Sequence, residues 1–220
     1  MREAVVLLSG GLDSSTLLHV LLDEEFSVTA LSVNYGQRHA CELEAARLVA
    51  AQASVPIIEL ALGSVLAPIF ARSTSSQVGQ KTAVPEGHYA EPSMRTTIVP
   101  GRNLLLLSLA AALAQSEGAS VIAYAAHAGD HSIYADCRTD FIAEAGRTLR
   151  LGYDLTLYDP FQAMSKADIV RKGAALRVPF ELTYSCYNGG ATHCGACGTC
   201  FERREAFRDA CVLDPTRYEG

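Results

Sequence analysis

Apolar runs and amphipathic stretches alternate over the first part of the chain. Residues 4–8 are continuously apolar, which is typical of a parallel strand that is buried on both faces. Residues 14–25 place leucines on one face at helical spacing, and residues 39–53 repeat that pattern with leucine and alanine. Residues 27–33 and 55–60 have the pattern of two further strands. The β-α-β-α-β order predicts an α/β fold with a doubly wound parallel sheet.

A long irregular segment interrupts this order before it resumes. Residues 67–100 contain four prolines and show little periodicity. A loop of this length inside a compact domain is usually functional or an insertion, so we expect a lid or part of a homodimer interface. Four apolar residues at its start need cover, namely Val65, Leu66, Ile69 and Phe70. Beyond it the pattern predicts helices over 101–116, 139–151 and 165–176, strands over 119–125 and 154–158, and a polar loop over 126–137.

The last forty residues differ from the rest in composition, because they are irregular and rich in cysteine and glycine. We therefore divide the chain into an α/β domain over residues 1–180 and a cysteine-rich C-terminal element over 181–220. Within that element, residues 201–209 have the pattern of a helix. Ser165 followed by Asp168 is typical of a capping box at the start of the preceding helix.

Composition narrows the possible partners. The 220 residues carry a net charge of −6, whereas domains that bind nucleic acid usually present a basic face, so nucleic acid is not an expected partner. No apolar run approaches the about 20 residues of a membrane span, and a glycine turn follows residues 4–8 too soon for a signal peptide. These features predict a cytoplasmic protein that acts on a small molecule.

The loop Ser9-Gly10-Gly11-Leu12-Asp13-Ser14-Ser15 joins the first strand to the first helix. Glycines let the backbone turn sharply, and the N-terminus of a helix presents unpaired N–H groups that suit a phosphate. Asp13 is suited to hold Mg²⁺, which offsets phosphate charge. A turn that is merely rich in small residues is the alternative. The residues predicted to bind ATP are Leu8, Ser9, Gly10, Gly11, Leu12, Asp13, Ser14, Ser15, Thr16, Leu17 and Leu18.

Four of the seven cysteines form the pattern C-x7-C-x2-C-x2-C, which comprises Cys186, Cys194, Cys197 and Cys200. Four thiolates at such spacings suit tetrahedral Zn²⁺, and a site filled by four cysteines is closed and therefore structural. A disulfide pair, an iron–sulfur cluster and catalytic thiols remain alternatives.

Three polar stretches follow predicted strands or open predicted helices, where ligands bind in open α/β sheets. Asn103 and its neighbour Arg102 open a helix, and an arginine there is electrostatically unfavourable unless it faces an anion. In the third stretch, Asp136 or Thr139 has the alternative role of a helix cap. The candidate substrate residues are Tyr35, Arg38, Arg102, Asn103, Asp130, Asp136 and Arg138.

Five sequence strings carry a resemblance to a known family. The string SGGLDSS looks like the loop of the PP-loop ATP pyrophosphatases. Together with NYGQRH, VPGRN, YADCRTDF and SCYNGG-x3-CGACGTC, it resembles the 7-cyano-7-deazaguanine synthase family of queuosine biosynthesis. These strings cover nearly the whole chain in the family's order. This chain has Leu12 where many members have glutamine, and it differs from many members over residues 127–131.

The resemblance implies an ATP-dependent carbon–nitrogen ligase that forms a nitrile from 7-carboxy-7-deazaguanine and ammonia. It also implies adenylated acid and amide intermediates, Zn²⁺ on four cysteines, and a homodimer. A guanine-like ring presents two adjacent donors, for which a carboxylate is the natural acceptor. We favour Asp136 and then Asp130 for this role, with Arg138 or Arg102 on the 7-carboxylate or a phosphate.

Three other functions share parts of this sequence pattern. A PP-loop transfer-RNA thiolase has the same loop but needs catalytic or cluster-binding cysteines and a basic surface. A related adenylating synthetase would attach the carboxylate to a protein or a nucleic acid. A zinc-binding scaffold without enzyme activity would leave the phosphate loop unused.

Overall fold

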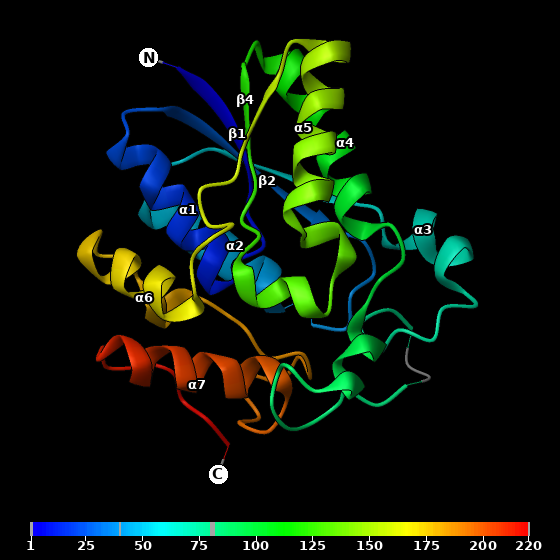
Figure 1. The fold of residues 1–220 in the computed structure, drawn as a ribbon, viewed down its shortest axis with the longest axis vertical. Coiled ribbons are helices and arrows are strands. Elements are labelled where there is room, and N and C mark those ends of the chain that lie inside the picture. The colour runs from blue at the N-terminus through cyan, green and yellow to red at the C-terminus, as the bar shows by residue number, and fades with distance from the viewer. Residues whose placement is uncertain (1, 40, 80–81, 220) are drawn as a thin grey trace.

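The computed structural model describes residues 2–39, 41–79 and 82–219 (Figure 1). Within these ranges five strands form a parallel sheet in the order β3-β2-β1-β4-β5. Residue 40 of the predicted helix 39–53 and residues 80–81 of the segment 67–100 lie outside the described residues. The same holds for residues 1 and 220, the outer ends of the two predicted units.

Every predicted strand is present. In the register of the sheet, Val6 on the central strand pairs with Ala30 on one side and Ala123 on the other. Alternate residues of that strand enter opposite cores, so Ala4 and Val6 face one layer of helices while Val5 faces the other. The continuous apolar run is explained by this burial on both faces. The strands are β1 (Glu3–Leu7), β2 (Ser27–Asn34), β3 (Ile57–Ala61), β4 (Val121–Ala123) and β5 (Thr156–Tyr158).

Helices cover both faces of the sheet, which confirms the doubly wound α/β fold (Figure 1). One face carries α1 (Leu12–Asp23), α2 (Cys41–Gln52), α6 (Lys166–Ala175) and α7 (Gly198–Ala210). The other face carries α3 (Gly63–Phe70), α4 (Arg102–Glu117) and α5 (Thr139–Tyr153). Among the described residues, none of these helices is long and apolar enough to cross a membrane.

The predicted irregular segment 67–100 needs a correction at its start. Helix α3 runs into it, and Leu66 and Phe70 are buried against the second core. The sequence pattern missed this helix because it is short and contains Pro68, a residue that removes a helical hydrogen bond. Further along, the short helix η1 (Pro92–Thr97) buries Met94 completely. The segment is therefore anchored to the core at more than one point.

The connections near the carboxyl edge of the sheet are short helical turns. The predicted polar loop 126–137 contains η2 (Ala128–Ser132) and η3 (Ala135–Cys137), and η4 (Phe180–Leu182) precedes the C-terminal element. The capping box at Ser165 is confirmed, since its hydroxyl accepts from the Asp168 N–H at 3.2 Å. Helix α5 has no side-chain cap, so the capping role considered for Asp136 is wrong.

The C-terminal element packs on the first core. Ala206 and Phe207 of α7 belong to that core. Arg203 on the same helix is almost completely buried and donates to Phe180 O at 3.0 Å and Thr183 Oγ1 at 2.9 Å. The helix is therefore held to the chain that leads into the element. The domain boundary near residue 180 stays a prediction.

Candidate active site and metal centre

The carboxyl ends of β1 and β4 lie side by side at the centre of the sheet, where the strand order changes direction. Such a switch point is where open α/β sheets bind ligands. A cavity of about 230 Å³ lies there. The loop that follows β1 lines it with Ser9, Gly11, Asp13 and Ser14. The structure thus places the predicted phosphate loop at the expected edge of the sheet.

The turn of this loop depends on Gly10. Its φ angle is +84°, in the left-handed region that disfavours other residues. A Cβ atom at this position would lie 2.2 Å from Glu42 O and 2.5 Å from Ala46 N, both backbone atoms of α2. The loop therefore approaches the backbone of α2 this closely only because residue 10 is a glycine.

Hydrogen bonds between small side chains hold the loop. The Ser9 N–H donates to Ser14 Oγ at 3.2 Å, and the Ser14 hydroxyl lies 3.3 Å from Gly11 O. Helix α1 begins after Gly11 without a side-chain cap, so its first-turn N–H groups stay available for an anion. Leu8 and Leu12 also line the cavity. The other predicted ATP residues lie behind the loop or in the core: Gly10, Ser15, Thr16, Leu17 and Leu18.

A partly buried lysine faces the loop from α6. The Lys166 ammonium lies 2.5 Å from Asp13 Oδ2 and 3.3 Å from Glu202 Oε2. Burial disfavours the charge on Lys166, but Asp13 and Glu202 outweigh it and raise the pKa of the lysine. Burial likewise opposes ionisation of Asp13, yet Lys166 and His127 keep its pKa below the usual value. Both side chains are therefore charged at neutral pH.

His127 connects this charged pair to Asp130. Its Nδ1 accepts from the Gly129 N–H at 3.1 Å, which leaves the ring hydrogen on Nε2. That Nε2 atom lies 3.5 Å from Asp130 Oδ2 and 3.4 Å from the Lys166 ammonium. The other oxygen of Asp130 accepts from the Tyr89 hydroxyl at 3.0 Å. Asp130 thus lines the cavity as a carboxylate held from two sides.

Tyrosines dominate the part of the cavity away from the loop. The Tyr134 hydroxyl lies 2.6 Å from Thr97 Oγ1 and 3.3 Å from the Tyr187 hydroxyl. Burial raises the pKa of Tyr35 to about 12, so it is a neutral phenol. Arg102 and Asn103 also line this part of the cavity. The tyrosines that line it are Tyr35, Tyr89, Tyr124, Tyr134, Tyr184 and Tyr187.

Three of the predicted substrate residues are not among those that line the cavity. The Arg38 guanidinium donates to Thr82 O at 2.9 Å. Arg138 is exposed and donates from Nε to His131 O at 3.0 Å. Asp136 precedes Cys137, which does line the cavity. Because successive residues of a short helical turn point in different directions, the string that contains Asp136, Cys137 and Arg138 could not show which of them lines the cavity.

Sequence reasoning missed Lys166, Glu202 and Tyr187, which all line the cavity. The sequence does mark Lys166, because this residue directly follows the helix cap. A positive charge there is unfavourable unless an anion lies nearby. The same argument had identified Arg102. Nothing in the local pattern marks Glu202 or Tyr187, which the C-terminal element brings to the cavity.

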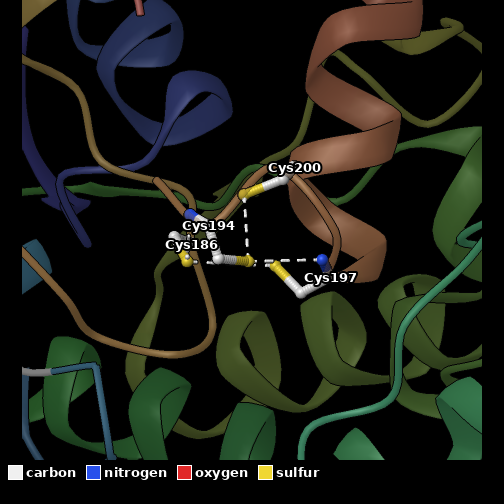
Figure 2. Close-up of side chains that lie close together, drawn as sticks. All are labelled: Cys186, Cys194, Cys197 and Cys200. Carbon is white, nitrogen blue, oxygen red and sulfur yellow. Dashed lines mark hydrogen bonds between the residues drawn. The ribbon is translucent and has the colours of Figure 1, made fainter. Parts of the chain in front are cut away.

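The four cysteines converge at the start of α7 (Figure 2). Their sulfur atoms all lie within 4.8 Å of one another, with 3.9 Å between Cys194 and Cys200 and 4.0 Å between Cys186 and Cys197. These separations are too long for a disulfide bond of about 2.05 Å. They are close to the edge of about 3.8 Å expected for four thiolates arranged tetrahedrally at ~2.3 Å from a metal ion. The donor set therefore fits a closed metal site.

The C-terminal element also forms one wall of the cavity. The Tyr184 N–H donates to Gly10 O at 2.9 Å, which ties the element directly to the phosphate loop. Tyr187, which directly follows Cys186, and Glu202, two residues after Cys200, both line the cavity. The cysteine cluster and the candidate active site are therefore formed by the same segment of the chain.

Comparisons with known proteins identify the family. The family model described as "Queuosine biosynthesis protein QueC" matches residues 3–211. The chain belongs to this family. It is 47% identical over 224 residues to "7-cyano-7-deazaguanine synthase 1" of Mesorhizobium japonicum, covering 99% of this chain and 94% of that relative. It is 46% identical over 221 residues to the 7-cyano-7-deazaguanine synthase of Methanoregula boonei, covering 99% of each chain.

A solved structure supports the fold independently of close sequence similarity. The NMN synthetase of Francisella tularensis superimposes with a TM-score of 0.54 at 17% identity. The match covers 86% of this chain and 68% of that one. At this identity the likeness concerns the fold alone. The sheet and its flanking helices are thus shared with a synthetase of different sequence.

Proposed function

We propose that this QueC-family chain converts 7-carboxy-7-deazaguanine and ammonia to 7-cyano-7-deazaguanine, with cleavage of ATP to AMP and pyrophosphate, in queuosine biosynthesis. The observation that carries this proposal is family membership over residues 3–211, with relatives that are named for this activity. The cavity supports it, because one side is a phosphate loop and the other an aromatic pocket. The transfer-RNA thiolase is not favoured, since the relatives match over almost the whole chain.

In this proposal the phosphates of ATP bind at the loop that follows β1. The Ser9 and Ser14 hydroxyls, the free N–H groups of α1 and the Lys166 ammonium supply donors and positive charge there. When a carboxylate attacks the α-phosphate, negative charge builds on the departing pyrophosphate. Fixed positive groups beside that charge lower the barrier, usually as the largest single contribution.

Mg²⁺ fits the same place. Asp13 Oδ1 is buried and has no hydrogen-bond partner within the described residues, although Oδ2 is paired with Lys166. Mg²⁺ in phosphate sites is typically held by one or two carboxylates together with phosphate oxygens, so Asp13 is the residue that would hold it. There the ion would offset phosphate charge.

The reaction needs two activations. The substrate carboxylate displaces pyrophosphate to give an acyl adenylate, and ammonia then displaces AMP to form the amide. The amide oxygen displaces a second pyrophosphate, and loss of AMP and the remaining nitrogen-bound protons leaves the nitrile. Free ammonium is the proposed nitrogen source. Each turnover therefore consumes two ATP and releases two AMP and two pyrophosphates.

Asp130 is the carboxylate best placed to accept from the base. It lines the cavity, whereas Asp136 is not among the lining residues. The guanine-like edge offers N1–H and an exocyclic amine, and a carboxylate accepts two parallel hydrogen bonds. Asp130 keeps this capacity beside its bond from Tyr89, because a carboxylate has about four acceptor sites.

The metal site is proposed to hold Zn²⁺ in a structural role. Four cysteines fill a tetrahedral shell and leave no position for a substrate. Within the described residues, every cysteine is free of disulfide bonds, which is the state expected in a reducing compartment such as the cytoplasm.

We propose that the segment beginning at α3 forms part of a homodimer interface. Val65 and Ile69 on this helix are 66% and 70% exposed, although Leu66 beside them is buried. Two large apolar side chains one helical turn apart form a stripe that a second copy would cover. Light scattering tests this proposal, because a monomer at micromolar concentration would contradict it.

Mass spectrometry tests the reaction directly. The assay contains the purified chain, the deazaguanine acid, ATP, Mg²⁺ and ammonium. We expect the nitrile to accumulate, with the amide as a transient species and two AMP per nitrile. Formation of ADP instead of AMP, or an absence of both amide and nitrile, would contradict the proposed function.

A further inference from the structure

Arg102 occupies an electrostatically unfavourable position. It is the first residue of α4, directly after Gly101, whose φ of +66° lets the chain turn into the helix. The N-terminus of a helix carries a partial positive charge, so a guanidinium placed there is repelled unless an anion offsets it. The side chain also lines the cavity rather than extending into solvent.

The described contacts of this guanidinium are with uncharged groups. Within the described residues, Arg102 forms no ion pair, and its Nε donates to Asn103 Oδ1 at 3.0 Å. Its guanidinium lies 5.9 Å from the centre of the Tyr134 ring. The same cavity is lined by Tyr35, Tyr124, Tyr134 and Tyr187, whose hydroxyls are uncharged polar groups.

The carboxylates of the cavity are engaged elsewhere. Lys166 pairs with Asp13 and Glu202. Asp130 accepts from Tyr89, and Glu42 lies 3.1 Å from the ring nitrogen of His39. Arg102 is therefore the cation of the cavity that is left without an anionic partner in the described part of the chain. This pattern points to a negatively charged group of the ligand.

We infer that Arg102 binds the carboxylate of the substrate acid, with neighbouring tyrosine hydroxyls as additional donors. This inference rests on the proposed function. A planar guanidinium forms two parallel bonds to a carboxylate, and phenol hydroxyls supply donors to its remaining acceptor sites. Burial raises the pKa of Tyr35, Tyr124 and Tyr187, so these groups donate as neutral phenols.

A phosphate of ATP is a weaker candidate for this arginine. The phosphate loop and Lys166 belong to α1 and α6 on one face of the sheet, whereas Arg102 belongs to α4 on the other. The two cations thus approach the cavity from opposite layers. Such a division lets Arg102 distinguish the charged acid from the neutral amide and nitrile that follow it.

Equilibrium binding tests the inference without turnover. Calorimetry is carried out without ATP on the wild type and on Arg102→Met and Arg102→Lys, using the deazaguanine acid and the corresponding carboxamide as ligands. Arg147→Met, which removes an exposed arginine on α5, is the matched control. ATP binding to each variant is measured separately and reports that the phosphate loop is intact.

We expect Arg102→Met to weaken binding of the acid by about 10- to 100-fold, the effect of losing a charged hydrogen-bonded pair. The carboxamide should change by less than about 3-fold, because it carries no charge to lose. For Arg102→Lys, the Kd for the acid should lie between the wild-type and Arg102→Met values. Lysine keeps the positive charge but lacks the planar guanidinium that forms two parallel hydrogen bonds. The Kd for ATP and all values for Arg147→Met should match the wild type.

Two results would overturn the inference while leaving the proposed function in place. One is an equal loss of affinity for acid and carboxamide in a variant that still binds ATP. The other is a loss confined to ATP, which would assign Arg102 to a phosphate. A wild type that binds neither the acid nor the carboxamide would overturn the proposed substrate and the inference together.

Discussion

Lys166 Nζ lies 2.5 Å from Asp13 Oδ2, although the two residues are separated by most of the chain. This contact places a positive charge from α6 against the loop that follows β1. Glu202 is the second carboxylate partner of the lysine, at 3.3 Å. The triad is therefore contributed by three separate helices.

Asp13→Asn should abolish nitrile formation while the protein stays folded. The substitution preserves shape but removes the charge that Mg²⁺ and Lys166 require. We expect the free energy of unfolding to fall by about 1–3 kcal/mol, because Glu202 still pairs with the lysine. Nitrile formation is measured by mass spectrometry and stability by urea denaturation. Asp23→Asn, an exposed change at the end of the same helix, is the control. Near-normal turnover of Asp13→Asn would contradict the role of this carboxylate.

Gly10→Ala should destabilise the protein and weaken ATP binding. The new Cβ would meet backbone atoms of α2, and the positive φ would be strained. The expected loss is about 1–3 kcal/mol, the usual effect of overpacking. Gly152→Ala is the matched control, since open space surrounds this helical residue. That change should stabilise by roughly 0.5–1 kcal/mol. If both substitutions shift the melting temperature equally, the close approach of this loop to α2 is not what restricts residue 10.

Metal analysis should find one Zn²⁺ per chain, and Cys197→Ser should lose it. Structural metal binding is coupled to folding, so the variant should melt at a lower temperature or become insoluble. Activity should fall as well, because Tyr187 and Glu202 enter the cavity from the same element. Cys211→Ser, at an exposed cysteine outside the cluster, should keep both metal and activity. A soluble Cys197→Ser protein with full activity and no metal would exclude the proposed role.

Asp130→Asn and Asp136→Asn should separate the two aspartates first considered for base recognition. The amide replaces one acceptor oxygen with a donor, which leaves a donor of the base unpaired at about 1–3 kcal/mol. We expect kcat/KM to fall by about 10- to 100-fold for Asp130→Asn alone, because Asp130 lines the cavity. Steady-state kinetics with the acid as varied substrate measures this. A larger loss of kcat/KM for Asp136→Asn would indicate that the η3 turn, and not Asp130, binds the base.

The contribution of Asp159 to the stability of the protein should fall as the pH rises from about 4 to 7. Burial raises the pKa of Asp159 to about 7, despite a hydrogen bond from Gln162 Nε2 at 2.8 Å. Between the unfolded and folded pKa values the native state holds more protons, so unfolding becomes easier as they are lost. One such group contributes at most about 1.4 kcal/mol per pH unit.

Urea denaturation at pH 5 and pH 7 measures this effect by comparing the wild type with Asp159→Asn. The variant should lack the part of the slope that belongs to Asp159, while every other titrating group is shared. Parallel pH profiles for the two proteins would show that Asp159 does not contribute.

The fold could be predicted from the sequence because the local pattern of apolar residues indicates which strands are buried. The run over residues 4–8 and the loop after it sufficed to place the phosphate site at the carboxyl end of a central strand. The cysteine cluster could also be predicted from local sequence, since three of its four members lie within seven residues. Helix α3 was not predicted, because the helix is short and contains Pro68, and both features obscure the helical pattern.

The substrate side of the cavity could be predicted only in part. Arg102 was recognisable because its position at a helix start is unfavourable without an anion. Asp136 and Arg138 share a string with Cys137, yet only the cysteine lines the cavity, and this depends on the path of the η3 turn. Lys166 and Glu202 meet Asp13 through tertiary packing, which no local pattern reports.

The bond from the Tyr184 N–H to Gly10 O has a consequence for the order in which the protein becomes active during synthesis. The phosphate loop leaves the ribosome first, but the residues that close its cavity belong to the last part of the chain. A nascent chain that ends before α7 has no Glu202 beside Lys166 and lacks the last cysteine of the cluster. Assembly of the complete cavity must therefore await translation of the C-terminal helix.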